Sequence, residues 1–365
     1  MKKVRSKNRL SFDWALIVIP VLFAVSSLAT LYSITAISGR TDLVVTQAIY
    51  FAISFVAYFL FAAMDYRVLK PYAWYLYFIG IALLIFVEFF GKTVFGSSRW
   101  INLGFFQLQP SELMKFIYII FAASYFSDMQ KFKLKAVVLF LAATLIPAVL
   151  ILREPDLGTT LVILASLITI IISIKPPAKF YYFSIAAILI FAPVAWYQLR
   201  PYQKARITSF MNPEKDPRAS GYNVIQSKIA VGSGGLYGKG FSGATQGQLS
   251  FLPVAHIDFI FSGWAEATGF IGSILLVFLY CFLLFRIFLI ANLSRDRFGQ
   301  LYSNALGGLL AFQIMINIGM NIGLAPITGI PLPLMSYGGT SLMVVSMMIG
   351  VVQSIYMRRK GLTFE

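Results

Sequence analysis

The sequence predicts an all-α polytopic membrane protein, and its composition and long apolar runs carry that prediction. Of the 365 residues, 59% are hydrophobic and only 12% are charged, against about 25% charged residues in a soluble domain. Apolar runs close to the length of a bilayer crossing recur from Trp14 almost to the C-terminus. A soluble globular protein is therefore excluded, and we treat residues 1–365 as a single integral membrane domain.

Apolar stretches bounded by charges or by Pro and Gly clusters predict the transmembrane helices in order. The basic segment Met1–Arg9 precedes the first stretch, which is longer than a signal-peptide core and is expected to be retained. The ten predicted helices lie near residues 14–37, 43–64, 72–90, 111–127, 134–152, 157–174, 179–198, 260–291, 301–322 and 335–357.

The net charge of +16 is interpreted as membrane topology and not as a nucleic-acid site. Lys and Arg residues fall between the apolar segments instead of forming a basic face or domain. With both termini cytoplasmic, most of these basic residues lie in cytoplasmic segments, as the positive-inside rule requires. The single cysteine, Cys281, allows no intrachain disulfide and no multi-cysteine metal site.

One large extracytoplasmic loop, residues 199–257, is predicted between the seventh and eighth helices. A segment of that length without structure of its own is functional or disordered. It contains the Gly-rich run from Gly232 to Gly243, which satisfies Gly-x-Gly-x-x-Gly at its end. No strand and helix surround this pattern and it faces outward, so we expect no nucleotide there but a flexible loop that bears on a substrate.

Asp258 is the sharpest candidate for chemistry, because it lies among apolar residues at the expected start of the eighth helix. Low polarity would raise its pKa and make it a better general base. The alternative is an interfacial helix N-cap, a position that favours Asp. Ser262 and Glu266 follow at four-residue spacing on the same helical face, and Glu266 is either a second site residue or a structural partner for a neighbouring helix.

Two further groups of charged residues lie near the outer boundary. Glu112 and Lys115 are three apart at the start of the fourth helix, where they form either a capped helix with an ion pair or a site in which Lys115 meets a phosphate. The turn from Arg153 to Gly158 is either a solvated turn or part of the site. His256, the only histidine, is more suited to an interfacial hydrogen bond than to catalysis.

The ninth predicted helix carries a polar stripe of Gln313, Asn317 and Asn321 at spacings of four. We interpret this stripe as interhelical hydrogen bonding.

Several motifs together carry a family resemblance. They are Ser97–Ile101, Gln109–Glu112 with Lys115, Pro155–Thr159, Gly232–Leu236, Asn317 with Gly323–Ile330, and Leu334–Ser341. In these motifs the chain resembles, over nearly its whole length, the SEDS family, which includes RodA, FtsW and SpoVE. The segments Thr245–Leu249 and Phe251–Pro253 are more similar to RodA than to FtsW.

The resemblance implies a ten-helix peptidoglycan glycosyltransferase of the bacterial inner membrane, active on the outer face during cell elongation. It implies that Asp258 is essential and that Glu112 and Lys115 are important. We take Asp258 as catalytic and the following as candidate substrate-binding residues: Glu112, Lys115, Arg99, Glu266, His256 and Ser336. This sequence departs from the family pattern at Ser98, Val254, Ile257 and Ala267, so a role is not assigned to every neighbour of Asp258.

The expected partners are lipid II, a class B penicillin-binding protein that acts as transpeptidase, and other membrane proteins of the elongation complex. Asp258 would take the proton from a sugar hydroxyl, with release of polyprenyl diphosphate. Lys115, Arg99 or a divalent cation such as Mg²⁺ or Mn²⁺ would offset the charge on the diphosphate. The metal site itself is unknown. Alternatives are a lipid II flippase, an FtsW-type division polymerase, or a scaffold without catalysis.

Overall fold

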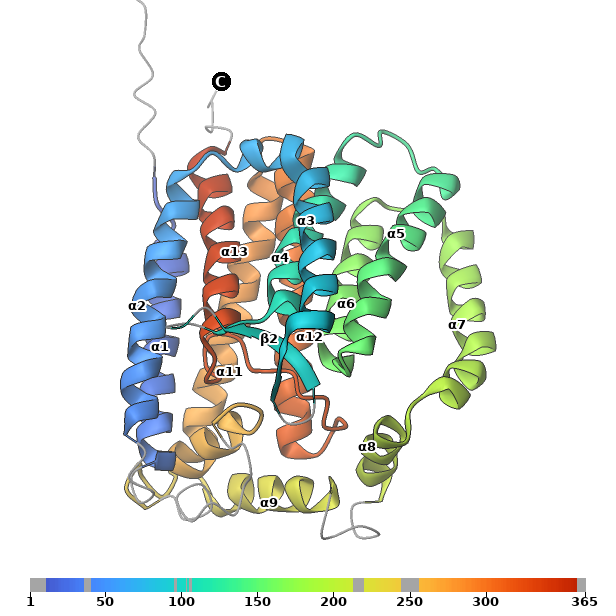
Figure 1. Cartoon of the computed structure of the whole chain (residues 1–365). Helices are drawn as coiled ribbons and strands as arrows, with labels where there is room; N and C mark the ends of the chain where they lie inside the picture. The colour runs from blue at the N-terminus through green and yellow to red at the C-terminus, as the bar shows by residue number, and fades with distance from the viewer. Residues whose placement is uncertain are drawn as a thin grey trace, which may run out of the picture.

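The computed structural model describes residues 11–35, 41–94, 97–102, 104, 107–212, 220–243 and 256–359. It is a bundle of long helices in which α1 begins and α13 ends at the same end of the molecule (Figure 1). Two shorter helices, α8 and α9, lie at the opposite end, below the bundle in this view.

Within the described residues a helix lies at each predicted range. These helices are α1 (Ala15–Thr35), α2 (Asp42–Ala63), α3 (Leu69–Phe90), α4 (Pro110–Ser127), α5 (Leu134–Arg153), α6 (Leu157–Ser173), α7 (Ala178–Gln198), α11 (Ile260–Leu293), α12 (Arg297–Ile322) and α13 (Gly339–Met357).

Seven spans in this part of the chain are long and apolar enough to cross a membrane, and α6 is a shorter apolar helix. The multi-spanning helical fold is therefore confirmed, and the crossing of all ten remains a prediction. Some boundaries differ from expectation. A 3₁₀ turn, η1 (Tyr66–Val68), leads into α3 three residues before the expected start, and α13 begins only at Gly339 after an irregular segment.

The strictly all-α expectation is wrong in one place. Between α3 and α4 the chain forms a small antiparallel sheet of β1 (Lys92–Val94), β2 (Ser97–Asn102) and β3 (Gln107–Leu108) in the order β1-β2-β3. Its register pairs Thr93 with Ser98 and Ile101 with Leu108. Strands this short satisfy backbone groups in the connection without a hydrophobic pattern that sequence reading could detect.

The segment expected to be a loop, residues 199–257, is partly helical. It contains α8 (Pro201–Met211) and α9 (Ser220–Ser233), and α9 lies across the end of the bundle and packs on α11 and α12. The segments 245–249 and 251–253, which carry the closer resemblance to RodA, lie outside the described residues.

The core is formed around α4, α12 and α13. α4 is buried on nearly all sides although it carries Glu112 and Lys115, as expected of a helix surrounded by others. α7 stands at the edge of the bundle (Figure 1) and exposes large apolar side chains, including Phe183, Leu189 and Tyr197. The predicted membrane crossing of α7 would place that surface against hydrocarbon.

α11 is broken at Gly269, where φ is 68° and ψ is −163°. The Gly-rich run docks against this break through four backbone hydrogen bonds. Two join the amides of Lys239 and Gly240 to the carbonyls of Glu266 and Ala267, at 2.9 Å each. The other two join the amides of Phe270 and Ile271 to the carbonyls of Gly235 and Leu236. The run is therefore held as a fixed backbone element here, and the expectation of a flexible loop is wrong for the described part.

Candidate functional site

Asp258 lies in a turn, residues 256–259, that immediately precedes α11. The N-cap of α11 is Phe259, and no side chain caps it. The N-cap interpretation of Asp258 is therefore wrong, because its carboxyl group does not cap the start of α11.

Three successive backbone carbonyls of this turn accept hydrogen bonds from other parts of the chain. The carbonyl of His256 accepts from the amide of Tyr337 at 2.9 Å, and that of Ile257 accepts from the hydroxyl of Ser336 at 2.6 Å. The carbonyl of Asp258 accepts from the side-chain amides of Asn317 and Asn321, each at 3.1 Å. The turn is thus fixed against α12 and the segment before α13.

Asn317 and Asn321 of the polar stripe on α12 bond to other segments, as their spacing predicted, but the side-chain oxygen of Gln313 has no hydrogen-bond partner within the described residues. Asn317 also donates to the carbonyl of Ile330 at 2.8 Å. The carbonyl oxygen of the Asn321 side chain accepts from the amide of Ser262 on α11, at 3.1 Å. Ser227 of α9 donates to the backbone carbonyl of Asn321 at 2.7 Å. These bonds join α9, α11 and α12 directly behind Asp258.

The carboxyl group of Asp258 is influenced by two charged side chains from distant parts of the chain. A Cβ atom placed on Gly329 would lie 3.9 Å from Nη1 of Arg206 and 3.9 Å from Oδ2 of Asp258, so both groups flank this glycine. Burial raises the pKa of Asp258 from 3.8 to about 6, with the positive charge of Arg206 lowering it and Asp156 raising it further. Such a carboxylate can accept a proton near neutral pH.

Arg206 is a site residue that the sequence did not single out. It extends from α8, donates to the carbonyl of Thr328 at 3.2 Å and lies over the ring of Tyr202. With Ser209, Asn223, Val224 and Ile327 it lines a cavity of about 110 Å³, which has room for a few waters of ~30 Å³ each or for a phosphate group. The sequence offered only one local signal for it, an arginine within the segment 199–257 that was predicted to be a loop.

In the turn between α5 and α6, Glu154 and Asp156 are buried whereas Arg153 is exposed, so the interpretation of a solvated turn is wrong for the two acids and holds only for Arg153. Asp156 caps α6 by accepting from the amide of Thr159 at 3.0 Å, and its charge reaches Asp258. Arg99 donates to the carbonyls of Glu154 and Pro155, the latter at 2.6 Å. Arg99 thus fixes this turn from β2.

Glu154 is an unusual acid in the same turn. It is 4% exposed, and neither of its carboxyl oxygens has a hydrogen-bond partner within the described residues. Burial raises its pKa from 4.5 to about 8, and Asp156 raises it further while Arg99 lowers it. Glu154 is therefore largely a neutral acid at pH 7.

Glu112 and Lys115 form an ion pair inside the bundle. The ammonium group lies 2.8 Å from Oε1 and 2.7 Å from Oε2 of the carboxylate, and the two side chains are 0% and 4% exposed. This geometry favours the ion-pair interpretation over direct contact with a phosphate. α4 begins at Pro110, one residue before the expected start, so Glu112 lies in its first turn.

Glu266 is fully buried near the break in α11, and the ammonium group of Lys239 lies 2.9 Å from its Oε1. Lys239 belongs to the Gly-rich run, so this ion pair adds to the backbone bonds that dock the run. The contact favours the structural interpretation of Glu266. The ring of His256 packs against that of Tyr337 at 5.6 Å, and Ser336 supports the turn through the backbone of Ile257.

Comparisons with known proteins agree with this arrangement. A family model for FtsW, RodA and SpoVE, described as "Cell cycle protein", matches residues 8–361. Over 317 residues the chain is 39% identical to peptidoglycan glycosyltransferase MrdB of Escherichia coli K12, covering 86% of this chain and 85% of that protein.

Two solved structures share the fold. One belongs to a peptidoglycan synthase complex described as coordinating polymerization and crosslinking, with a TM-score of 0.83 and 28% identity, covering 95% of this chain and 98% of that one. The other is rod shape determining protein RodA of Thermus thermophilus, with a TM-score of 0.73 and 26% identity, covering 97% and 99%.

Proposed function

Because this chain belongs to the FtsW, RodA and SpoVE family, we propose that it is a RodA-type peptidoglycan glycosyltransferase that polymerises lipid II during cell elongation. The observation that carries the chemistry is Asp258, a carboxylate with a raised pKa on a turn whose backbone is fixed by three successive carbonyl contacts. A group that must take a proton repeatedly gains from a fixed position and a pKa near the working pH.

In the proposed reaction, the donor is a glycan whose anomeric carbon bears the α-linked lipid diphosphate, and the acceptor is a sugar 4-hydroxyl of a second lipid II. Asp258 takes the hydroxyl proton as the oxygen attacks the anomeric carbon. The new glycosidic bond forms on the opposite face, the bond to the diphosphate breaks, and polyprenyl diphosphate leaves with the electron pair. One in-line displacement therefore inverts the anomeric centre.

The charge on the leaving diphosphate needs cationic groups close to Asp258. We assign this task to Arg206, because its guanidinium flanks the same glycine as the carboxyl group of Asp258 and also lines a small cavity. The ammonium group of Lys115 is enclosed with Glu112, and Arg99 is engaged with backbone carbonyls. In this proposal those two residues position neighbouring segments.

The diphosphate of the substrate offers a divalent cation more suitable ligands than the described residues of the protein offer by themselves. No group of three or more His, Cys, Asp or Glu side chains in the described part of the chain is placed to hold a metal ion. Mg²⁺ bound to a diphosphate needs only one or two protein carboxylates. We therefore assign any such cation to the diphosphate, and no step above depends on it.

The remaining parts of the proposal concern topology and partners. With ten membrane crossings and both termini cytoplasmic, the end of the bundle that holds Asp258, α8 and α9 faces outward, in the bacterial inner membrane. Lipid II would enter with its prenyl tail in the bilayer. A class B penicillin-binding protein is the proposed transpeptidase partner, supported by the likeness to a chain of a peptidoglycan synthase complex.

The test is polymerisation of purified lipid II by the wild type and Asp258→Asn, each with and without Mg²⁺ or Mn²⁺ and the partner protein. Equal thermal midpoints would show that the variant is folded. Glycan ladders from the wild type alone support the proposal. A folded wild type without product under every condition would indicate a flippase, and ladders from Asp258→Asn would remove Asp258 from the chemistry.

A further inference from the structure

A second cavity lies at the other end of the bundle, where α1 begins and α13 ends. Its volume is about 240 Å³, and it is bounded by the starts of α3 and α12 and by the end of α4. The lining residues are Arg67, Lys70, Ser127, Asp296, Arg297 and Phe298. The lining thus contains three cationic side chains and one acidic side chain, Asp296.

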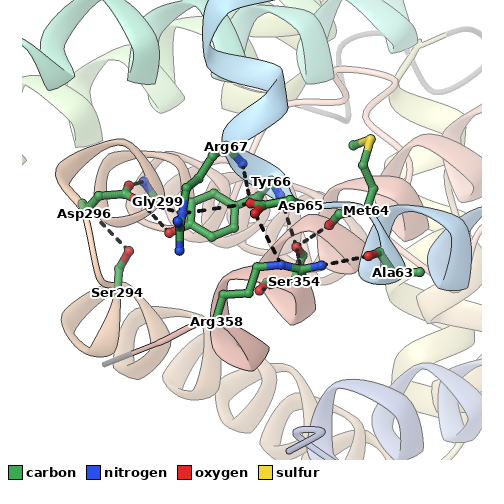
Figure 2. Close-up of polar contacts among 10 residues, drawn as sticks. All are labelled: Ala63, Met64, Asp65, Tyr66, Arg67, Ser294, Asp296, Gly299, Ser354 and Arg358. Carbon is green, nitrogen blue, oxygen red and sulfur yellow. Dashed lines mark hydrogen bonds and ion pairs between the residues drawn. The ribbon is translucent and has the colours of Figure 1, made fainter. Parts of the chain in front are cut away.

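The single acid is already engaged by neighbouring groups (Figure 2). Asp296 accepts from the amide of Gly299 at 2.8 Å and from the hydroxyl of Tyr66 at 2.5 Å. The guanidinium of Arg67 lies 3.7 Å from Asp296 and 3.9 Å from Asp65, outside tight hydrogen-bond range in both cases. Two neutral donors therefore stabilise the carboxylate of Asp296, and Arg67, which also interacts with the hydroxyl of Tyr66, contacts both acids only at long range. Its guanidinium can still contact another anion.

Arg297 and Lys70 interact only weakly, or not at all, with carboxylates in the part of the chain that the structure describes. No carboxylate in the described ranges lies within ion-pair distance of Arg297. Lys70 lies 2.6 Å from Asp128, but the side chain of Asp128 is 75% exposed, and such surface pairs contribute little. An anion that enters the cavity can therefore contact Lys70 together with Asp128, and can contact Arg297, without breaking a strong ion pair of the protein.

The level of the cavity along the bundle, relative to the lipid headgroups of a membrane, indicates what kind of anion can reach it. Trp74 follows Lys70 by four residues, so the two share a face of α3. Trp74 is 50% exposed, and Tyr72 and Tyr75 beside it are 56% and 68% exposed. Exposed Trp and Tyr near the end of a spanning helix mark the level of the lipid headgroups. Lys70 and the cavity therefore lie at headgroup level.

We propose that this cavity binds the phosphate of an anionic phospholipid in the leaflet on the side of the chain termini. Arg67, Lys70 and Arg297 are the cationic ligands, and the acyl chains lie along the aromatic face of α3. Basic pockets between spanning helices bind anionic headgroups in this way. The bound lipid joins η1, α3 and α12 at one point.

The test is retention of lipid by the purified full-length chain in native mass spectrometry, with equal amounts of phosphatidylglycerol and phosphatidylcholine. The variant Arg297→Gln removes one ligand. Arg295→Gln is the matched control, because Arg295 loses the same charge two residues away but is exposed and outside the cavity.

We expect the wild type and Arg295→Gln to retain phosphatidylglycerol in preference to phosphatidylcholine. Arg297→Gln should lose about fivefold in phosphatidylglycerol retention, equivalent to the ~1 kcal/mol that one basic residue contributes near an anionic surface. Lys70→Gln should show a loss of the same direction. Thermal midpoints identify any variant that fails to fold, and the wild-type comparison of the two lipids needs no variant.

Equal retention of the two lipids by the wild type would overturn the proposal. So would equal losses in Arg297→Gln and Arg295→Gln, because they would show a diffuse charge effect. Displacement of phosphatidylglycerol by millimolar inorganic phosphate would show an anion site without lipid preference and would also overturn it. The readout is binding, so it is independent of the polymerase activity proposed above.

Discussion

The buried pair of Glu112 and Lys115 gives a prediction that separates a structural role from a catalytic one. At 2.7 Å, two unit charges attract by roughly 6 kcal/mol at an effective dielectric constant of about 20. Desolvation of both groups offsets most of that attraction. Removing one partner is different, because it leaves an uncompensated charge inside the bundle at a cost of about 3–5 kcal/mol.

We therefore expect Lys115→Met to unfold at a clearly lower temperature than the wild type. The double variant Glu112→Gln with Lys115→Met should recover most of the loss, because neutral side chains of similar volume replace both charges. Scanning fluorimetry in detergent measures the thermal midpoints. A Lys115→Met variant as stable as the wild type, or a double variant as unstable as the single one, would refute the reasoning.

Polymerisation of lipid II by the double variant then decides between the two roles. If it recovers activity together with stability, the pair acts only by holding α4 in place. If it is folded but inactive, Lys115 contributes to binding the diphosphate in a state that this structure does not display. Glu112→Gln alone serves as the control for loss of the acid.

Three further predictions concern the site and the elements that support it. Gly269→Ala should lower the thermal midpoint by an amount equivalent to about 1–3 kcal/mol from backbone conformation alone, because φ 68° with ψ −163° is adopted almost only by glycine. The new Cβ would also lie 2.3 Å from the amide nitrogen of Gly238, which adds to the loss. Gly232→Ala, with open space around it, should be close to neutral. Polymerisation should rise with pH through about 6, because only the deprotonated Asp258 can act as base; a flat rate across this range would contradict that role. Stability of the wild type should fall as pH rises from 4.5 through about 8, because the folded state favours protonated Glu154, which contributes at most about 1.4 kcal/mol per pH unit. Glu154→Gln should remove the part of this dependence above about pH 6, where the raised pKa of Asp258 no longer contributes, and thermal midpoints measured across the interval check this.

The spanning helices could be predicted from the sequence because a bilayer requires long apolar runs, and these runs are visible without tertiary information. Asp258 could be predicted for a related reason, since an acid among Ile257, Phe259 and Ile260 is costly without a purpose. The interhelical role of Asn317 and Asn321 followed from their spacing on one helical face.

Other parts of the site depend on contacts between distant segments and left no local pattern. Arg206 reaches Asp258 only because α8 brings it beside Gly329, more than a hundred positions later in the chain. The break at Gly269 lies in an apolar run where any small residue would look ordinary. Its cause is the backbone of the Gly-rich run, whose amides and carbonyls take the places of helix partners.

The way the Asp258 turn is held has a consequence for repeated synthesis. Its backbone is bonded to α12 and to the segment before α13, so a shift of the turn would break several hydrogen bonds together. Both proposed substrates, in contrast, are carried by lipid tails that diffuse freely in the plane of the bilayer. Successive sugars would therefore arrive at a carboxylate that keeps its place within the protein, and the growing strand would have to shift relative to that carboxylate after each bond is made.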